Sequence, residues 1–212
     1  MTNAMSAEYG ADPNVNPRLA QAIATAKKAG FPKSSIESAI ARGQGVSATG
    51  AALETLTLEA IMPPSVATVI DCQTDSKART LAAIRLLIKE HGGTVTPTSY
   101  LFEKRGKIVF ERAEGLGVYE VLDEAVEAGA MDIEEDEQGR VVVYTEPSQT
   151  KAAAEEMAAA RGLKVESSDI IWDPNEETMV ELDSEKDVQK LDDFVQAVQE
   201  DPSVQNVYLN VA

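Results

Sequence analysis

The sequence of 212 residues contains one cysteine, Cys72, and one histidine, His91. A single cysteine excludes an internal disulfide and multi-cysteine zinc or iron–sulfur sites, and a single histidine excludes two-histidine metal motifs. The longest uncharged runs have 11 or 12 residues, whereas a transmembrane helix needs about 18. The first basic residue is Arg18, so no secretory signal with a charged start is readable. The lone thiol and the missing signal favour a reducing compartment inside the cell.

Patterns that would indicate catalysis or ligand binding are also missing. The glycines of 43–45 and 115–117 do not fit a phosphate-binding loop. The carboxylates of 132–137 lack the glycine that a calcium loop needs at its sixth position, and are typical of a solvated hairpin. We expect His91 to end a helix and Cys72 to be buried in a strand. The sequence therefore predicts a protein that is not an enzyme, with no cofactor, no metal site and no small-molecule substrate.

The sequence is instead rich in charge of one sign, with 36 acidic against 19 basic residues and a net charge of −17. The charge is uneven: residues 1–45 carry net +2, residues 46–105 are neutral, and residues 106–172 and 173–212 carry −10 and −9. The apolar content of 43% is sufficient for a packed core. We expect any polyanion to meet the first half, with the acidic half facing away; solubility alone is the competing explanation.

Two short helices are predicted in the first domain. The first begins at Asn16-Pro17 and ends before Gly30. The second is predicted to begin with a capping box, in which Ser34 caps the helix and Glu37 reaches back, and to end at Gly43. These helices bury too little surface to form a domain on their own.

Basic side chains of the first half are the candidate contacts for nucleic acid or the ribosome. They lie on the two short helices, on a third predicted helix, and in a turn of Lys104, Arg105 and Lys107 predicted around Gly106. Because aromatic residues make up only 5% of the chain, the sequence favours phosphate contacts over base stacking. A solvated basic face is the competing explanation. The candidates are Arg18, Lys27, Lys28, Lys33, Arg42, Lys77, Arg79, Arg85, Lys89, Lys104 and Arg105.

The remaining chain predicts alternating strands and helices. The order within 106–172 is βαββαβ, which is that of a ferredoxin-like fold. Its first helix is predicted to bury Val118, Leu122, Ala125 and Val126. The predicted strands are 56–61, 66–72, 99–103, 107–110, 131–135, 140–145, 163–171, 178–182 and 204–211, and the predicted helices are 76–90, 118–128, 148–161 and 185–199.

These elements predict a multidomain α+β fold. A truncated helical N-terminal domain, 1–45, precedes a discontinuous α+β domain formed by 46–105 and 173–212. The ferredoxin-like domain, 106–172, is inserted into it.

Several sequence blocks resemble the YebC/PmpR family. Asp12–Leu19 is similar to its D-P-x-x-N-P-R-L segment, and Gly30–Gly43 to its M-P-K-x-x-I-E-x-A-I-x-x-G helix. Thr74–Thr80 resembles its T-D-x-x-x-R-T turn, and the blocks His91–Gly93 and Tyr100–Gly106 follow in the same order. The order and spacing agree from about residue 10 to the C-terminus.

The resemblance implies a three-part fold and a role in gene expression without catalysis. Bacterial members are described as transcriptional regulators or ribosome-associated factors, and a mitochondrial member as a translational activator of cytochrome c oxidase subunit I. The segments Met62–Ser65 and Ser167–Pro174 resemble the mitochondrial branch. The resemblance thus implies a ribosome or messenger RNA as partner, in mitochondria, with the cytoplasm as the alternative compartment.

One departure from the family concerns the first residues. Family members usually begin with a Lys/Arg-rich helical segment, whereas Met1–Ala11 carries no basic residue. We therefore expect a shortened form, from an incomplete gene prediction, an expressed fragment or an isoform. Two alternatives stay open beside the translation factor: a transcriptional regulator that binds duplex DNA, and a module that binds proteins through its acidic half. No membrane partner is expected.

Overall fold

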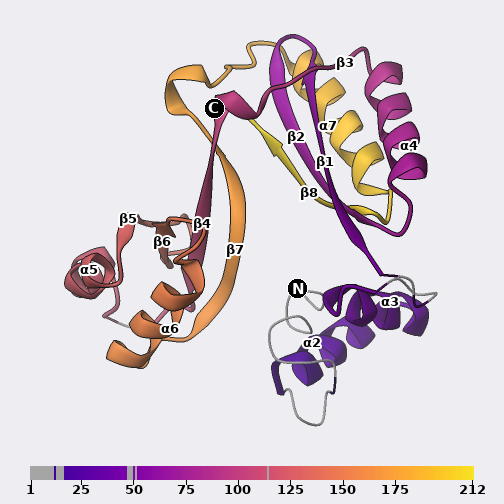
Figure 1. Ribbon diagram of the computed structural model, residues 1–212. Helices are drawn as coiled ribbons and strands as arrows, with labels where there is room; N and C mark the ends of the chain where they lie inside the picture. The colour runs from indigo at the N-terminus through magenta and orange to yellow at the C-terminus, as the bar shows by residue number, and fades with distance from the viewer. Residues whose placement is uncertain (1–11, 13–16, 47–49, 51, 114) are drawn as a thin grey trace. The chain divides into compact units, whose positions relative to one another are not determined.

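The computed structural model describes residues 12, 17–46, 50, 52–113 and 115–212. The chain divides into two compact units, one from residues 1–96 and 182–207, the other from 97–181 and 208–212 (Figure 1). Mixed α+β architecture, with helices first and two sheets after them, confirms the predicted fold class. The unit boundaries lie outside the predicted 106–172 insertion because the strands that border it are longer than predicted. The division into three domains stays a prediction.

The first helices that the structure describes in the first unit are α2 (Pro17–Lys28) and α3 (Lys33–Gly43). Gly30, at φ +81°, ends α2: its N–H donates to the Lys27 carbonyl, and the next N–H donates to the Ala26 carbonyl. Such paired bonds with a left-handed glycine form a Schellman motif. The predicted capping box is wrong, because the cap position of α3 is Pro32, two residues before Ser34, and it makes no side-chain cap.

The sheet of the first unit has the strand order β3-β1-β2-β8. The long strands pair antiparallel in a hairpin that turns at Pro63-Pro64, where proline could not serve as an internal strand residue. Helices α4 and α7 pack against each other, and α4 packs on β1. The strands are β1 (Glu54–Met62), β2 (Val66–Thr74), β3 (Thr94–Val95) and β8 (Val204–Leu209), and the helices are α4 (Lys77–Glu90) and α7 (Glu185–Gln199).

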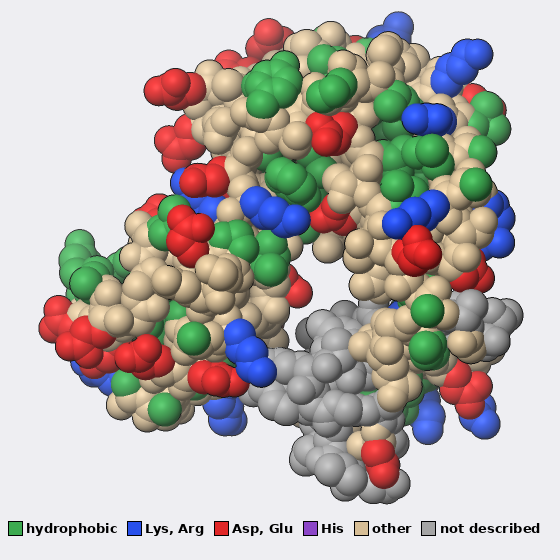
Figure 2. Space-filling model, viewed as in Figure 1, with side chains coloured by type: hydrophobic (Ala, Val, Ile, Leu, Met, Phe, Trp, Pro, Cys, Tyr) green, Lys and Arg blue, Asp and Glu red, His purple; other side chains and the backbone are tan. Residues whose placement is uncertain are grey.

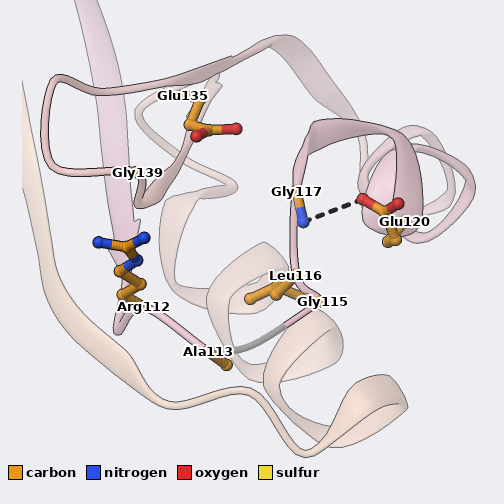
Figure 3. A pocket seen from close by; sticks show the side chains of 8 residues that line it. All are labelled: Arg112, Ala113, Gly115, Leu116, Gly117, Glu120, Glu135 and Gly139. Atoms are coloured by element: carbon orange, nitrogen blue, oxygen red, sulfur yellow. Dashed lines mark hydrogen bonds between the residues drawn. The ribbon is translucent and has the colours of Figure 1, made fainter.

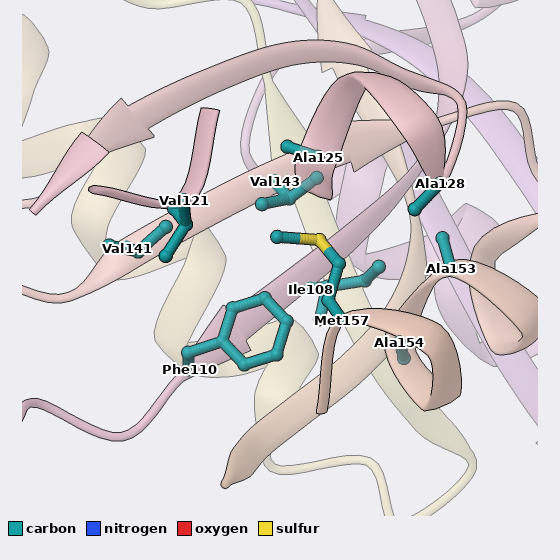
Figure 4. Packing of buried hydrophobic residues seen from close by; sticks show 10 residues of the cluster. All are labelled: Ile108, Phe110, Val121, Ala125, Ala128, Val141, Val143, Ala153, Ala154 and Met157. Atoms are coloured by element: carbon teal, nitrogen blue, oxygen red, sulfur yellow. The ribbon is translucent and has the colours of Figure 1, made fainter. Parts of the chain in front are cut away.

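The sheet of the second unit has the order β5-β6-β4-β7, with every pair antiparallel. Both helices cover one face of it, and their side chains share one core with β4 and β6 (Figure 4). This is the predicted βαββαβ unit. Its elements are β4 (Phe102–Phe110), α5 (Val118–Glu127), β5 (Ala130–Glu135), β6 (Val141–Thr145), α6 (Thr150–Arg161) and β7 (Val165–Pro174).

Three predicted elements differ in the structure. Residues 99–101 form a short 3-10 helix, η1 (Ser99–Leu101), and the strand that follows runs unbroken to Phe110. The predicted turn around Gly106 is therefore wrong: the glycine lies inside β4, where a side chain would collide with Thr145 and Thr150. The predicted strand 178–182 is also wrong, because η2 (Glu176–Thr178) is followed by a single bridge between Val180 and Val211.

The buried face of α5 also differs from the prediction. Val121 and Ala125 are buried, while Leu122 and Val126 are 40% and 65% exposed. Both sets are spaced at three or four residues, so helical periodicity alone could not choose between them.

Candidate nucleic-acid interface

The candidate cations of the first two helices lie near helix ends. Lys27 and Lys28 are exposed in the last turn of α2, and neither forms an ion pair with a described residue. Their charge also complements the dipole at the end of the helix. Lys33 pairs with Glu37 across 3.4 Å, and the Arg42 guanidinium donates to the Pro202 carbonyl. Arg18 lies within α2, and its side chain is outside the described residues.

The candidate cations of α4 divide into paired and unpaired ones. At the start of the helix, Lys77 contacts Glu54 at 2.9 Å and Arg79 contacts Asp75. Further along, Arg85 and Lys89 are exposed, and no described carboxylate pairs with either of them. Their four-residue spacing places them on one face of the helix, and Figure 2 shows basic side chains over α4.

The two remaining candidates lie in the second unit, on β4. Lys104 Nζ is 4.9 Å from the centre of the Trp172 ring, which faces it from β7. Arg105 is held between Glu103, at 2.7 Å, and Asp173, at 3.1 Å. Burial alone would lower the pKa of the Arg105 guanidinium, but the hydrogen bond to Glu103 and the charges of Glu103 and Asp173 together raise it, so this cation is already neutralised by its neighbours.

The structure therefore sorts the predicted cations by their availability. Among the described side chains of the candidate set, four are exposed and form no ion pair: Lys27 and Lys28 on α2, and Arg85 and Lys89 on α4. A cation already neutralised by a carboxylate has less charge to offer a phosphate, and the unpaired ones are the stronger candidates.

Phe31 is a further candidate that sequence analysis did not single out. It follows the Schellman glycine, lies between α2 and α3, and is 59% exposed. Residues at this position of the motif commonly pack back on the helix, so an exposed ring is available to a partner. The available signal was a lone aromatic residue between Lys28 and Lys33.

The lone histidine and cysteine lie in packed surroundings. His91 ends α4, its Nδ1 lies 2.8 Å from the Leu87 carbonyl, and its ring contacts Phe194. Cys72 is 2% exposed in β2. Burial, with smaller contributions from Asp201 and Asp71, raises the pKa of its thiol to about 12, so the reactive thiolate is suppressed.

A pocket of about 640 Å³ lies in the second unit beside the start of α5 (Figure 3). Arg112 lines it on one side, and Glu120 lies on the other, accepting a bond of 3.0 Å from the Gly117 N–H. Glu135 and backbone glycines complete the lining. None of these lining residues is a serine, cysteine or histidine.

Among the described residues, no cluster of three or more His, Cys, Asp or Glu side chains could hold a metal ion. Nor does any helix there have the length and apolarity to cross a membrane.

Comparison with known proteins places these surfaces in context. A family model described as the TACO1/YebC second and third domain matches residues 53–211, and one described as the TACO1/YebC protein N-terminal domain matches residues 1–46. A probable transcriptional regulatory protein of Frankia casuarinae is 36% identical over 204 residues, covering 95% of this chain and 79% of the relative. One from Nitrosomonas europaea is 35% identical over 202 residues, covering 94% and 81%.

A solved structure is similar along the whole chain. The crystal structure of a conserved hypothetical protein from Aquifex aeolicus has a TM-score of 0.67 and 32% identity, covering 100% of this chain and 86% of the other.

Proposed function

The chain belongs to the TACO1/YebC family, and from this premise we propose that it is a non-enzymatic regulator of gene expression that binds the ribosome or messenger RNA as a translational activator. The observation that carries the proposal is the set of four exposed, unpaired cations, Lys27, Lys28, Arg85 and Lys89, among the described residues of the first half. Phosphate binding requires cations of this kind, because affinity comes from the counterions that they displace.

The acidic charge of the second half also favours binding of a polyanion by the first half. Residues 106–172 and 173–212 carry net −10 and −9 and would repel a polyanion. The exposed positions of α4 include Ala78, Ala82 and Leu86 beside the two cations, and the helix has no Asn or Gln, the side chains that read adenine. Contacts that neutralise phosphates without reading sequence suit folded RNA, whose recognition depends largely on shape and backbone.

The test is co-sedimentation of the protein with ribosomes across a salt series. Replacing Lys27, Lys28, Arg85 and Lys89 by Gln should weaken binding and reduce the slope of log K against log salt by about three. The matched control neutralises four cations outside this set, Lys151, Lys164, Lys186 and Lys190, and removes the same total charge. It should bind as the unaltered protein does. Equal weakening by both sets would contradict the proposed surface.

Stability must be measured beside binding. Lys27, Lys28 and Lys89 lie in last helical turns, where each cation contributes about 0.3–1 kcal/mol through the helix dipole. Thermal unfolding of both variants separates lost contacts from lost folding.

A duplex-DNA regulator is the second candidate, because the bacterial relatives are named probable transcriptional regulatory proteins. Fluorescence titration with duplex DNA at fixed salt distinguishes the two. Binding at least a thousandfold tighter to one sequence than to others would favour the transcriptional role. Salt-sensitive binding to ribosomes without that preference favours translation.

For the compartment, we propose mitochondria, on the resemblance of 62–65 and 167–174 to the mitochondrial branch. Imaging of the full-length protein carrying a C-terminal fluorescent tag in its own cells tests this. A signal spread through the cytoplasm would contradict it.

A further inference from the structure

The outer face of α5 exposes three apolar side chains that the core does not use. Tyr119, Leu122 and Val126 are 89%, 40% and 65% exposed. Their spacing of three and four residues aligns them in one stripe along the helix. We call these three residues the α5 outer face.

The opposite side of the same helix already supplies the packing that the fold needs. Val121 and Ala125 are fully buried in the cluster with Ile108, Phe110 and Met157 (Figure 4). A single helix in a two-layer domain needs one apolar stripe, and its solvent side is ordinarily polar. The α5 outer face is therefore a second apolar stripe with no role in this core.

An acidic stripe runs beside the apolar one. Glu120, Asp123 and Glu127 are exposed and repeat with the same three- and four-residue spacing, one position further along. Neither Asp123 nor Glu127 forms an ion pair with any described residue, while Glu120 accepts the bond from Gly117 N–H. Figure 2 shows hydrophobic and acidic side chains gathered at the left edge, over α5. Together the two stripes form a surface with an apolar half and a negative half.

We propose that the α5 outer face is a docking site for a basic amphipathic helix of a partner protein. Such a helix would pack its apolar side chains on Tyr119, Leu122 and Val126 and place Lys or Arg side chains beside Asp123 and Glu127. Helices recognise apolar surfaces through side chains at this spacing, and charge complementarity sets their orientation.

The charge of the surface selects this occupant over three others. Nucleic acid and an anionic lipid surface would be repelled by the acidic stripe, because the one guanidinium close to it among the described residues, that of Arg161, is already paired with Glu124. A second copy of the chain would bring a second acidic stripe against the first, at a cost from like charges. A basic, partly apolar protein segment satisfies both stripes at once. The proposal is independent of the nucleic-acid contact made by the first half.

The test titrates the full chain with three synthetic helical peptides and follows their fluorescence anisotropy. The first peptide carries adjacent Leu and Lys stripes, the second keeps Leu with Glu for Lys, and the third keeps Lys with Ser for Leu. We expect the first to bind at least tenfold tighter than either of the others. Equal binding of the first and third peptides would show that a basic peptide binds this acidic protein by charge alone. That result would overturn the proposal.

Protein variants locate the binding on α5. Replacing Tyr119, Leu122 and Val126 by Gln should weaken the first peptide at least tenfold, because an exposed aromatic anchor commonly dominates such contacts. Asp123→Lys with Glu127→Lys should weaken it similarly. The matched control, Glu155→Lys with Glu156→Lys on the exposed side of α6, makes the same charge change and should bind normally.

Two further measurements keep the result decisive. Thermal unfolding of each variant shows that the fold is intact, as expected for exposed positions. Sedimentation velocity tests self-association: a concentration-dependent dimer that the Gln variant abolishes would assign the surface to a second copy and overturn the proposal. Unchanged peptide binding by the Gln variant would overturn it as well.

Discussion

Gly106 lies inside β4 at a position where the neighbouring side chains leave no room for a Cβ atom. A Cβ atom built on it would lie 2.7 Å from Thr150 Cβ and 2.5 Å from Thr145 Oγ1. The two threonine hydroxyls are hydrogen-bonded to each other across 3.1 Å, where β6 ends and α6 begins. Glycine is needed here for close approach, so the strand continues through a residue that otherwise indicates a turn.

Gly106→Ala should therefore destabilise the protein by about 1–3 kcal/mol through overpacking. Chemical denaturation measures the change. The same substitution should cost less in a Thr150→Ala background, because part of the obstructing side chain is then absent. An equal cost in both backgrounds would show that the contact with Thr150 is not the cause.

At the scale of the element, α5 has two apolar stripes with opposite environments. Val121 is fully buried and Val126 is 65% exposed, so one chemical change can be compared on both faces. Val121→Ala should cost about 2 kcal/mol, from the lost burial and the cavity left behind. Val126→Ala should change stability by less than about 0.5 kcal/mol, because an exposed position loses little packing. Urea unfolding of the two variants gives the comparison, and equal costs would contradict the assigned faces.

Elements with strong local signals were predictable from the sequence. The bounds of α7 agree residue for residue, since its apolar side chains repeat over four turns and Asp201-Pro202 follows it. The hairpin of β1 and β2 was predictable because Pro63-Pro64 interrupts an apolar run. Elements without such signals were missed: β3 has two residues, and its pairing with β1 is set by the sheet.

The sequence indicates which basic residues belong to the candidate site, but it does not indicate which of them are free of ion pairs. Arg79 pairs with Asp75, which lies just before α4, across a spacing of four residues in sequence, so this pair could have been expected. The partners of Lys77 and Arg105 are Glu54 and Asp173, which the folded sheets bring to them. Which cations stay unpaired therefore depends on long-range structure that no local pattern contains.

At the scale of the whole molecule, the second unit contains everything that its core needs. Its four strands and two helices, and all ten residues of its main cluster, lie between 102 and 174. The first unit, in contrast, draws α7 and most of β8 from the far side of the insertion. The two units that the structure shows, with bounds near 97 and 181, differ from the predicted insertion of 106–172, and the division into three domains stays a prediction.

A fragment of residues 97–181 should therefore fold alone with a cooperative thermal transition, measured by circular dichroism. Its melting temperature should rise with added salt, because screening weakens the repulsion within its strongly acidic sequence. The fragment 1–96 is the comparison: it lacks the buried Leu191, Phe194 and Val198 of α7 and should show no cooperative transition. A cooperative 1–96 fragment, or a 97–181 fragment without a transition, would contradict this division.

The strand order β3-β1-β2-β8 has a consequence for biosynthesis. β2 is almost wholly buried in the finished protein, yet its neighbour β8 is encoded after the whole inserted unit. At about 5–20 residues per second, a nascent chain carries the open edge of β2 for on the order of ten seconds before β8 is made. Throughout that interval the inserted unit can complete itself, while the first unit displays an apolar edge of the kind that chaperones shield. Assembly thus runs outward from the inserted unit, and β8, which is translated after that unit, closes the sheet that β1 and β2 began.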